Sequence, residues 1–137
     1  MMEHDRDSGH EGAPGGGGAP RAGLHRRWVS AAQAAAVPVA AGQLAAPVMA
    51  HGTLLVEYYA PRGADAQTPH SRDEVYIVIR GSGWFVNGAE RRRFQAHDVL
   101  FVPAGVTHRF EDFTDDFAVW VVFYGPKGGE TADPTQA

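Results

Sequence analysis

Short runs of apolar residues, many of them alternating with polar ones, fill the chain between about residues 52 and 126. In the clearest run, EVYIVIRG at 74–81, odd and even positions point to opposite faces of a strand. Asn87-Gly88 lies between two such runs and favours the type I′ turn of a tight hairpin. No helical pattern interrupts the strands, so the sequence predicts one all-β, double-sheet barrel of the jelly-roll type. The predicted strands lie in residues 53–60, 74–81, 84–86, 99–102, 107–113 and 117–125, with a further run after Asn87-Gly88 that ends at Phe94.

The residues before these runs have a different pattern. Ser30 is a good helix N-cap, and the Ala-rich residues 31–37 favour a short helix that ends before Pro38. We expect residues 39–50 to be a covering segment and Trp28 to anchor this region by packing. Residues 1–27 are Gly-rich with few apolar side chains, which is typical of disorder. The predicted parts are a disordered tail (1–27), helix and covering segment (28–50), barrel (51–126) and flexible C-terminal tail (127–137).

Composition narrows the functional classes. The 137 residues, 44% of them hydrophobic and 20% charged, are enough for one folded domain. The chain has no cysteine, which excludes disulfides and thiolate metal ligands. Its formal net charge of -4 argues against nucleic acid and anionic membranes as partners. No segment approaches the roughly 20 apolar residues that span a bilayer, so we expect a cytoplasmic protein.

Two segments place metal-type side chains beside tight turns. In QTPHSRDEVYIVIRGSG (67–83), His70 and Glu74 would lie about 13 Å apart on an unbroken strand, too far to share an ion. The intervening residues 71–73 favour a reversal that would bring the two side chains together. In DVLFVPAGVTHRFED (98–112), the turn at 103–105 precedes His108 in the same way.

These segments resemble the two signature motifs of the cupin superfamily, and the resemblance implies a double-stranded β-helix. Thr68 stands where the family has its first histidine, so one of the four usual metal ligands is absent. His97 replaces the usual leading glycine of the second motif, and Asp112 replaces its terminal asparagine. The matching positions are Gly63, His70, Glu74, Gly81, Pro103, Gly105 and His108.

The resemblance leaves His70, Glu74 and His108 as the metal ligands. Two imidazoles and one carboxylate suit a divalent first-row metal and leave coordination positions open for substrate and dioxygen. We favour Fe(II), with Zn, Mn or Ni as alternatives. A three-ligand site is preferred over recruitment of Thr68, Gln67 or Asp65 as a fourth ligand, although an irregular backbone before Pro69 would permit the latter two.

Several side chains are candidates for a substrate pocket around this ion. Tyr76 and Phe110 follow Glu74 and His108 by two residues, so each should face the barrel interior. On the last strand, alternation allows either of two sets of side chains to face the interior. One set is Trp120, Val122 and Tyr124, and the other is Val119, Val121 and Phe123. An aromatic cavity would suit a small, partly apolar organic acid, although the rings could equally be core packing. The candidate pocket residues are Thr68, Gln67, Tyr76, Phe110 and Trp120.

Small single-domain cupins include iron dioxygenases acting on hydroxyanthranilate or cysteine and several isomerases of sugars or keto acids. The resemblance therefore implies a metal-dependent dioxygenase or isomerase acting on a small organic molecule. The alternatives are a non-catalytic ligand-binding cupin and a metal-free epimerase in which His70 and Tyr76 exchange protons with a sugar. We also expect a homodimer, because residues 53–60 would form an apolar edge strand suited to pairing with a second sheet.

Overall fold

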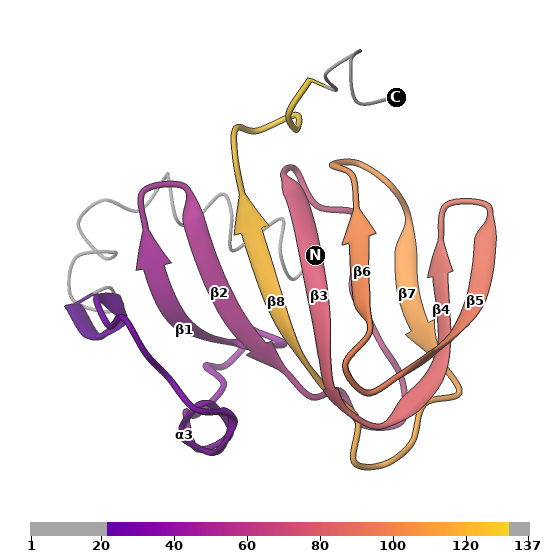
Figure 1. Cartoon of the computed structure of the whole chain (residues 1–137), viewed down its shortest axis with the longest axis horizontal. Coiled ribbons are helices and arrows are strands. Elements are labelled where there is room, and N and C mark those ends of the chain that lie inside the picture. Colours follow the sequence, from indigo (N-terminus) through magenta and orange to yellow (C-terminus); the bar gives the residue numbers. More distant parts are fainter. Residues whose placement is uncertain (1–21, 132–137) are drawn as a thin grey trace.

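The computed structural model describes residues 22–131, which form two antiparallel sheets that face each other around one core (Figure 1). The larger sheet contains, in spatial order, β1 (Ala46–His51), β2 (Leu54–Tyr59), β8 (Ala118–Tyr124), β3 (Asp73–Arg80) and β6 (Val99–Val102). The smaller sheet has the order β5 (Glu90–Gln95), β4 (Ser82–Asn87) and β7 (His108–Glu111). The predicted all-β jelly-roll is confirmed.

The strand register aligns the buried side chains of the larger sheet in rows. Glu74 on β3 pairs with Phe123 on β8, which pairs with Leu55 on β2. In the next inward-facing row, Tyr76, Val121 and Glu57 occupy the same three strands. All six side chains are buried, whereas Ile77 on the opposite face of β3 is exposed. The alternation predicted for β3 is therefore present, and it directs Glu74 into the barrel.

The hairpin between β4 and β5 forms where it was predicted, but with a different turn. Asn87 pairs with Glu90, so Gly88 and Ala89 are the two loop residues. Gly88 has a φ of 61°, whereas Ala89 has no positive φ. A type I′ turn needs positive φ at both central residues, so the expected type I′ turn is wrong. Gly88, at the first central position, supplies the conformation that residues with a Cβ rarely adopt.

The N-terminal helix α3 (Ala31–Ala35) is present and ends earlier than predicted. Its cap is a capping box, in which the Ser30 hydroxyl accepts from the Gln33 N–H and the Gln33 side chain accepts from the Ser30 N–H. Trp28 is 73% exposed, so the expectation that it anchors this region is wrong. Val29 and Ala34 instead pack against the outer face of the sheet.

The barrel starts earlier than the predicted residue 51, because residues 46–51 form β1 rather than a covering segment. This strand occupies the edge of its sheet, so β2 pairs on both sides and is not the exposed edge that was expected. A 3-10 turn, η1 (Ala22–Leu24), precedes α3, and Leu24 is buried in the core. This turn falls within the predicted tail 1–27, of which residues 1–21 lie outside the described residues.

The segment after β8 is tied to the barrel within the described residues. Gly128 N–H donates to the Ser71 carbonyl at 2.6 Å, and Glu130 N–H donates to Asp73 Oδ2 at 2.8 Å. The predicted flexible tail (127–137) thus includes residues with hydrogen bonds to the barrel, while residues 132–137 lie outside the described part.

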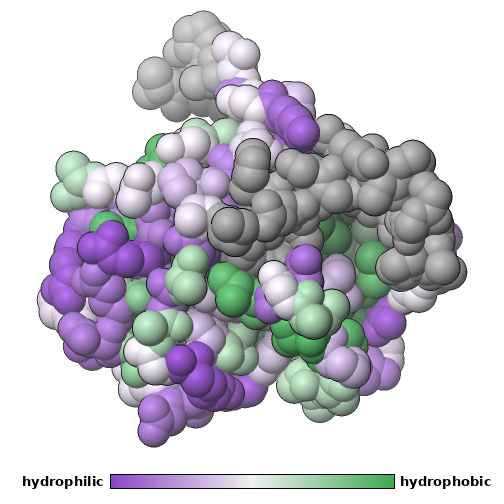
Figure 2. All heavy atoms as spheres, turned by 180° about the vertical axis from the view of Figure 1, so that it is seen from behind, coloured by the Kyte–Doolittle hydropathy of each residue, from purple (hydrophilic) through white to green (hydrophobic). Residues whose placement is uncertain are grey.

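Polar side chains gather on the side of the molecule formed by the smaller sheet, at the left of Figure 2. On its outer face, Arg91 and Arg93 stack on Trp84, with guanidinium carbons 4.4 and 5.4 Å from the ring centroid. Among the described residues, none of the helices has the length and apolar character needed to cross a membrane.

Candidate metal centre

Three separate parts of the barrel contribute His70, Glu74 and His108. His70 lies in the irregular segment before β3, where its carbonyl accepts from the Gly105 N–H at 2.8 Å. Glu74 is the second residue of β3, and His108 is the first residue of β7 in the opposite sheet. The predicted reversal after His70 is present, because bends at 71 and 72 precede the strand.

The three side chains meet inside the barrel. One ligand atom from each lies within 4.8 Å of the other two. His108 Nε2 is 3.1 Å from Glu74 Oε1, and His70 Nδ1 also contacts this oxygen. The two imidazole rings are 4.6 Å apart at a near-perpendicular angle of 87°. Exposed fractions of 3% for His70, 0% for Glu74 and 2% for His108 show that protein surrounds the whole group.

The hydrogen bonds of this group leave ligand atoms directed at one another. His108 Nδ1 lies 2.8 Å from the Val106 carbonyl oxygen, which can only accept a hydrogen bond, so this contact orients the ring with Nε2 toward Glu74. Burial alone would raise the pKa of Glu74, but interactions with His108 and His70 outweigh it and lower the pKa below its usual value. Glu74 is therefore an anion facing two imidazoles.

This donor set fits a divalent metal ion. Both Glu74 oxygens and His108 Nε2 are buried without a hydrogen bond of acceptable geometry, which is costly unless another group satisfies them. A cation held by these atoms would remove that cost, and imidazole with carboxylate suits first-row divalent metals.

The residues proposed as a fourth ligand have other roles. Thr68 is exposed. Gln67 is buried, but its Oε1 accepts from the Tyr76 hydroxyl at 2.7 Å and its Nε2 donates to Asp65 Oδ2 at 2.6 Å. Asp65 also accepts from the Tyr59 hydroxyl and from the Phe110 N–H, the latter at 2.9 Å. The oxygens of Gln67 and Asp65 are thus used in a hydrogen-bond network, which supports a three-ligand centre.

The aromatic candidates divide between the barrel interior and the outer face of the larger sheet. Tyr76 and Phe110 are buried inside, with ring centroids 4.9 Å apart, and the Tyr76 ring is 6.0 Å from His108. Trp120 lies on the outer face, where it packs near α3 and meets Tyr58 edge-on at 6.0 Å. The inward set on β8 is therefore the alternative one, and Trp120 does not line the interior. That set is Val119, Val121 and Phe123.

Sequence reasoning gave no interior role to two further charged residues. Glu57 is fully buried. The sequence signal that could have found it is alternation along residues 54–59, which places this carboxylate on the inward face of an apolar strand. Arg72 is 4% exposed, and its Nη1 donates to the Thr53 carbonyl. The arginine has no periodic signal because it lies in the irregular segment before β3.

Comparison with known families agrees with this geometry. The cupin domain model Cupin_2 matches residues 55–124, just over half of the chain, and the chain therefore belongs to the cupin domain family. It is similar to an uncharacterized protein of Streptomyces coelicolor, with 41% identity over 63 residues. That match covers 46% of this chain and 60% of the relative, so the chain accounts for less than two thirds of that protein.

Solved structures share the fold at low sequence identity. An uncharacterized conserved protein with a double-stranded β-helix domain from Klebsiella pneumoniae has a TM-score of 0.58 and 18% identity, covering 73% of this chain and 90% of that one. A Cupin 2 conserved barrel domain protein from Salinispora arenicola has a TM-score of 0.56 and 19% identity, covering 74% and 91%. These similarities extend to the fold alone.

Proposed function

We propose that this protein is a metal-dependent cupin enzyme, a dioxygenase or isomerase acting on a small organic molecule. The observation that carries the proposal is the convergence of His70, Glu74 and His108 on one buried point, where one ligand atom from each lies within 4.8 Å of the other two. Fe(II) is the favoured ion, and Zn, Mn or Ni are the alternatives. When bound, such an ion would supply a Lewis acid with open positions for substrate and dioxygen.

The protein's own residues would prepare the site for this chemistry. Glu74 is held ionised, and the Val106 carbonyl orients the His108 ring. Tyr76 and Phe85 lie beside His108, with ring centroids at 6.0 and 6.4 Å, and would keep bulk water away from it. The Tyr76 hydroxyl donates to Gln67 at 2.7 Å, and this bond holds the ring in place beside His108.

The test compares His108→Ala with His51→Ala, a control in which an exposed histidine is removed from the end of β1. Elemental analysis should find near-stoichiometric metal in the wild type and the control, and little in His108→Ala. Dioxygen uptake with a panel of small organic acids is then measured before and after metal removal. Full uptake by metal-free protein would sink the dioxygenase proposal.

Two alternatives predict different outcomes of the same test. A non-catalytic ligand-binding cupin would bind small molecules equally well in the wild type and His108→Ala, without turnover. A metal-free epimerase would need Tyr76 as a proton donor, whereas its hydroxyl already donates to a buried amide. The hydrogen bond therefore favours the metal-dependent proposal over the epimerase.

We also propose that the protein works as a cytoplasmic homodimer. The outer face of β3 and β6 carries exposed apolar side chains at Ile77, Val99 and Phe101, with exposed fractions of 37%, 66% and 48%. Exposed apolar groups of this kind favour association. A light-scattering mass equal to one chain would contradict the dimer.

A further inference from the structure

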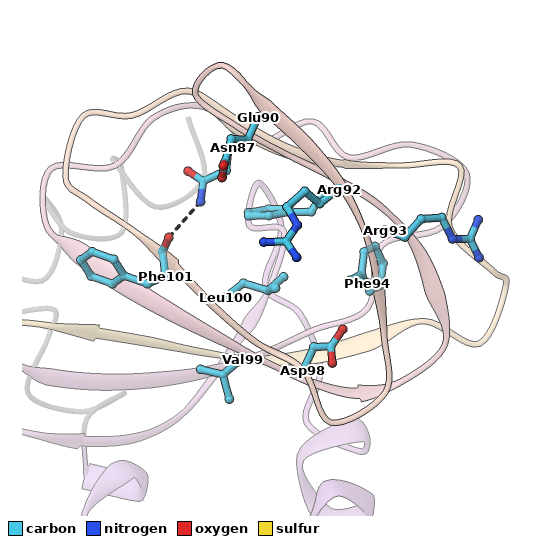
Figure 3. A pocket seen from close by; sticks show the side chains of 10 residues that line it. Asn87, Glu90, Arg92, Arg93, Phe94, Asp98, Val99, Leu100 and Phe101 are labelled. Atoms are coloured by element: carbon cyan, nitrogen blue, oxygen red, sulfur yellow. Dashed lines mark hydrogen bonds between the residues drawn. The ribbon is translucent and has the colours of Figure 1, made fainter.

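A cavity of about 340 Å³ opens between the two sheets where β5 and β6 leave their edges unpaired (Figure 3). Its apolar lining comes from both sheets and includes Phe85, Phe94 and Leu100. The Asn87 side chain donates to the Phe101 carbonyl at 2.9 Å, which connects the sheets at one end of the cavity. This volume is within the range of small-ligand pockets in proteins.

Residues 91–93 are three consecutive arginines, and the strand register places one of them, Arg92, in this cavity. Arg92 pairs with the buried Phe85, whereas Arg93 pairs with Trp84 on the outer face. In Figure 3 the Arg92 guanidinium points into the cavity, over Leu100, and that of Arg93 points away. Within residues 22–131, no hydrogen bond or ion pair holds the Arg92 guanidinium. Arg92 is therefore a cation available to a ligand in the cavity.

Two acidic residues also border the cavity and limit what it can bind. Asp98 accepts a hydrogen bond from the Gln95 N–H at 2.9 Å, so one of its oxygens is used in the turn before β6. Glu90 lies near the Asn87 end. A second negative group on the ligand would meet these carboxylates, so a ligand with one anionic group fits better than a polyanion.

The cavity lies beside the candidate metal centre. Phe85 lines the cavity, and the same ring is 5.7 Å from Tyr76 and 6.4 Å from His108. The Phe85 ring thus lies both at the wall of the cavity and next to the candidate metal centre. None of His70, Glu74 and His108 lines the cavity itself.

We propose that this cavity binds a small monocarboxylate with a flat apolar body, with the carboxylate on Arg92 and the body against Phe85, Phe94 and Leu100. The guanidinium suits a carboxylate because it donates parallel hydrogen bonds, and the phenyl rings offer aromatic contacts. Binding in this cavity does not rest on the proposed function, because none of the three candidate metal ligands lines it.

Benzoate is the probe, titrated into the full-length protein while backbone amide signals are followed by NMR. We expect saturable shifts at Phe94 and Leu100, and binding at least about tenfold weaker for the neutral analogue benzamide because it lacks the ion pair. Arg92→Gln should weaken benzoate binding by a similar factor, while Arg93→Gln, the matched control on the outer face, should leave it unchanged. Glu90→Gln should tighten binding, because it removes a like charge.

No saturable benzoate binding at these residues, or equal binding by Arg92→Gln and the wild type, would overturn the inference. The same titration of His108→Ala separates this result from the metal proposal. Benzoate binding that persists in this variant supports the cavity whether or not the wild type holds metal. A metal-loaded wild type that does not bind benzoate refutes the cavity and leaves the metal centre standing.

Discussion

Asp65→Asn should destabilise the barrel strongly, because Asp65 accepts four hydrogen bonds from donors that line the interior. Its Oδ1 accepts from the Tyr59 hydroxyl and the Gln67 N–H, and its Oδ2 accepts from Gln67 Nε2 and the Phe110 N–H. Asparagine keeps one oxygen and replaces the other with an NH₂ group. In either orientation of the amide, this NH₂ group would face a backbone N–H that donates to the carboxylate in the wild type, that of Gln67 on one side or that of Phe110 on the other.

The loss can be worked out from these bonds. Hydrogen bonds to charged groups contribute about 1.5–3 kcal/mol each, and Asp65 is only partly buried, so we expect a total loss of about 2–4 kcal/mol. For a domain of this size the corresponding decrease in Tm is about 10–20 °C. Tyr76→Phe removes one bond at the far end of the same network and should cost about 1 kcal/mol.

Urea unfolding of metal-free protein followed by tryptophan fluorescence measures both values. The exposed Asp115 provides the matched control, and Asp115→Asn should change the free energy of unfolding by less than about 0.5 kcal/mol. A loss below that size for Asp65→Asn would show that the network does not hold the segment before β3 on the barrel.

Three further outcomes follow from the backbone and the charges. Gly81→Ala should destabilise far more than Gly63→Ala, because both glycines have positive φ but only at Gly81 would a Cβ meet Phe117 Cα, at 2.7 Å; equal Tm values would contradict this. His97→Gly should stabilise by up to about 1 kcal/mol in urea unfolding, because His97 has a φ of 78°, and a loss of stability would refute the strain. Burial raises the pKa of Glu74, but the two imidazoles outweigh burial and hold the folded-state pKa below 4.5. Above pH 4.5, metal-free wild type should therefore have a stability advantage, a larger free energy of unfolding, over Glu74→Gln. That advantage should be lost as pH falls through the folded pKa, and a pH-independent difference would contradict the ionised pair.

The sequence predicted those parts of the fold in which local pattern decides the structure. Alternation on residues 74–81 identified the inward face of β3. The two motifs brought His70, Glu74 and His108 together because their spacing encodes turns as well as ligands. The positive φ of His97 and of Asp112 also explains why the family has glycine and asparagine there, since both tolerate this conformation.

Features that depend on long-range pairing were not predictable. Residues 46–51 are Ala-rich and contain Pro47, so their β propensity is low, and they form a strand only through pairing with β2. Parity could not choose between the two faces of β8, and packing against α3 places Trp120 outside. Gln67 and Asp65 lie in an irregular segment, where a period of two predicts no direction.

A crystal structure of protein loaded with one divalent metal, with an anomalous difference map recorded at that metal's absorption edge, tests the central claim most directly. We predict a single strong peak inside the barrel, about 2.0–2.2 Å from one nitrogen each of His70 and His108 and from a Glu74 oxygen. A peak elsewhere, or an empty barrel with the two imidazoles turned apart, would contradict the metal centre.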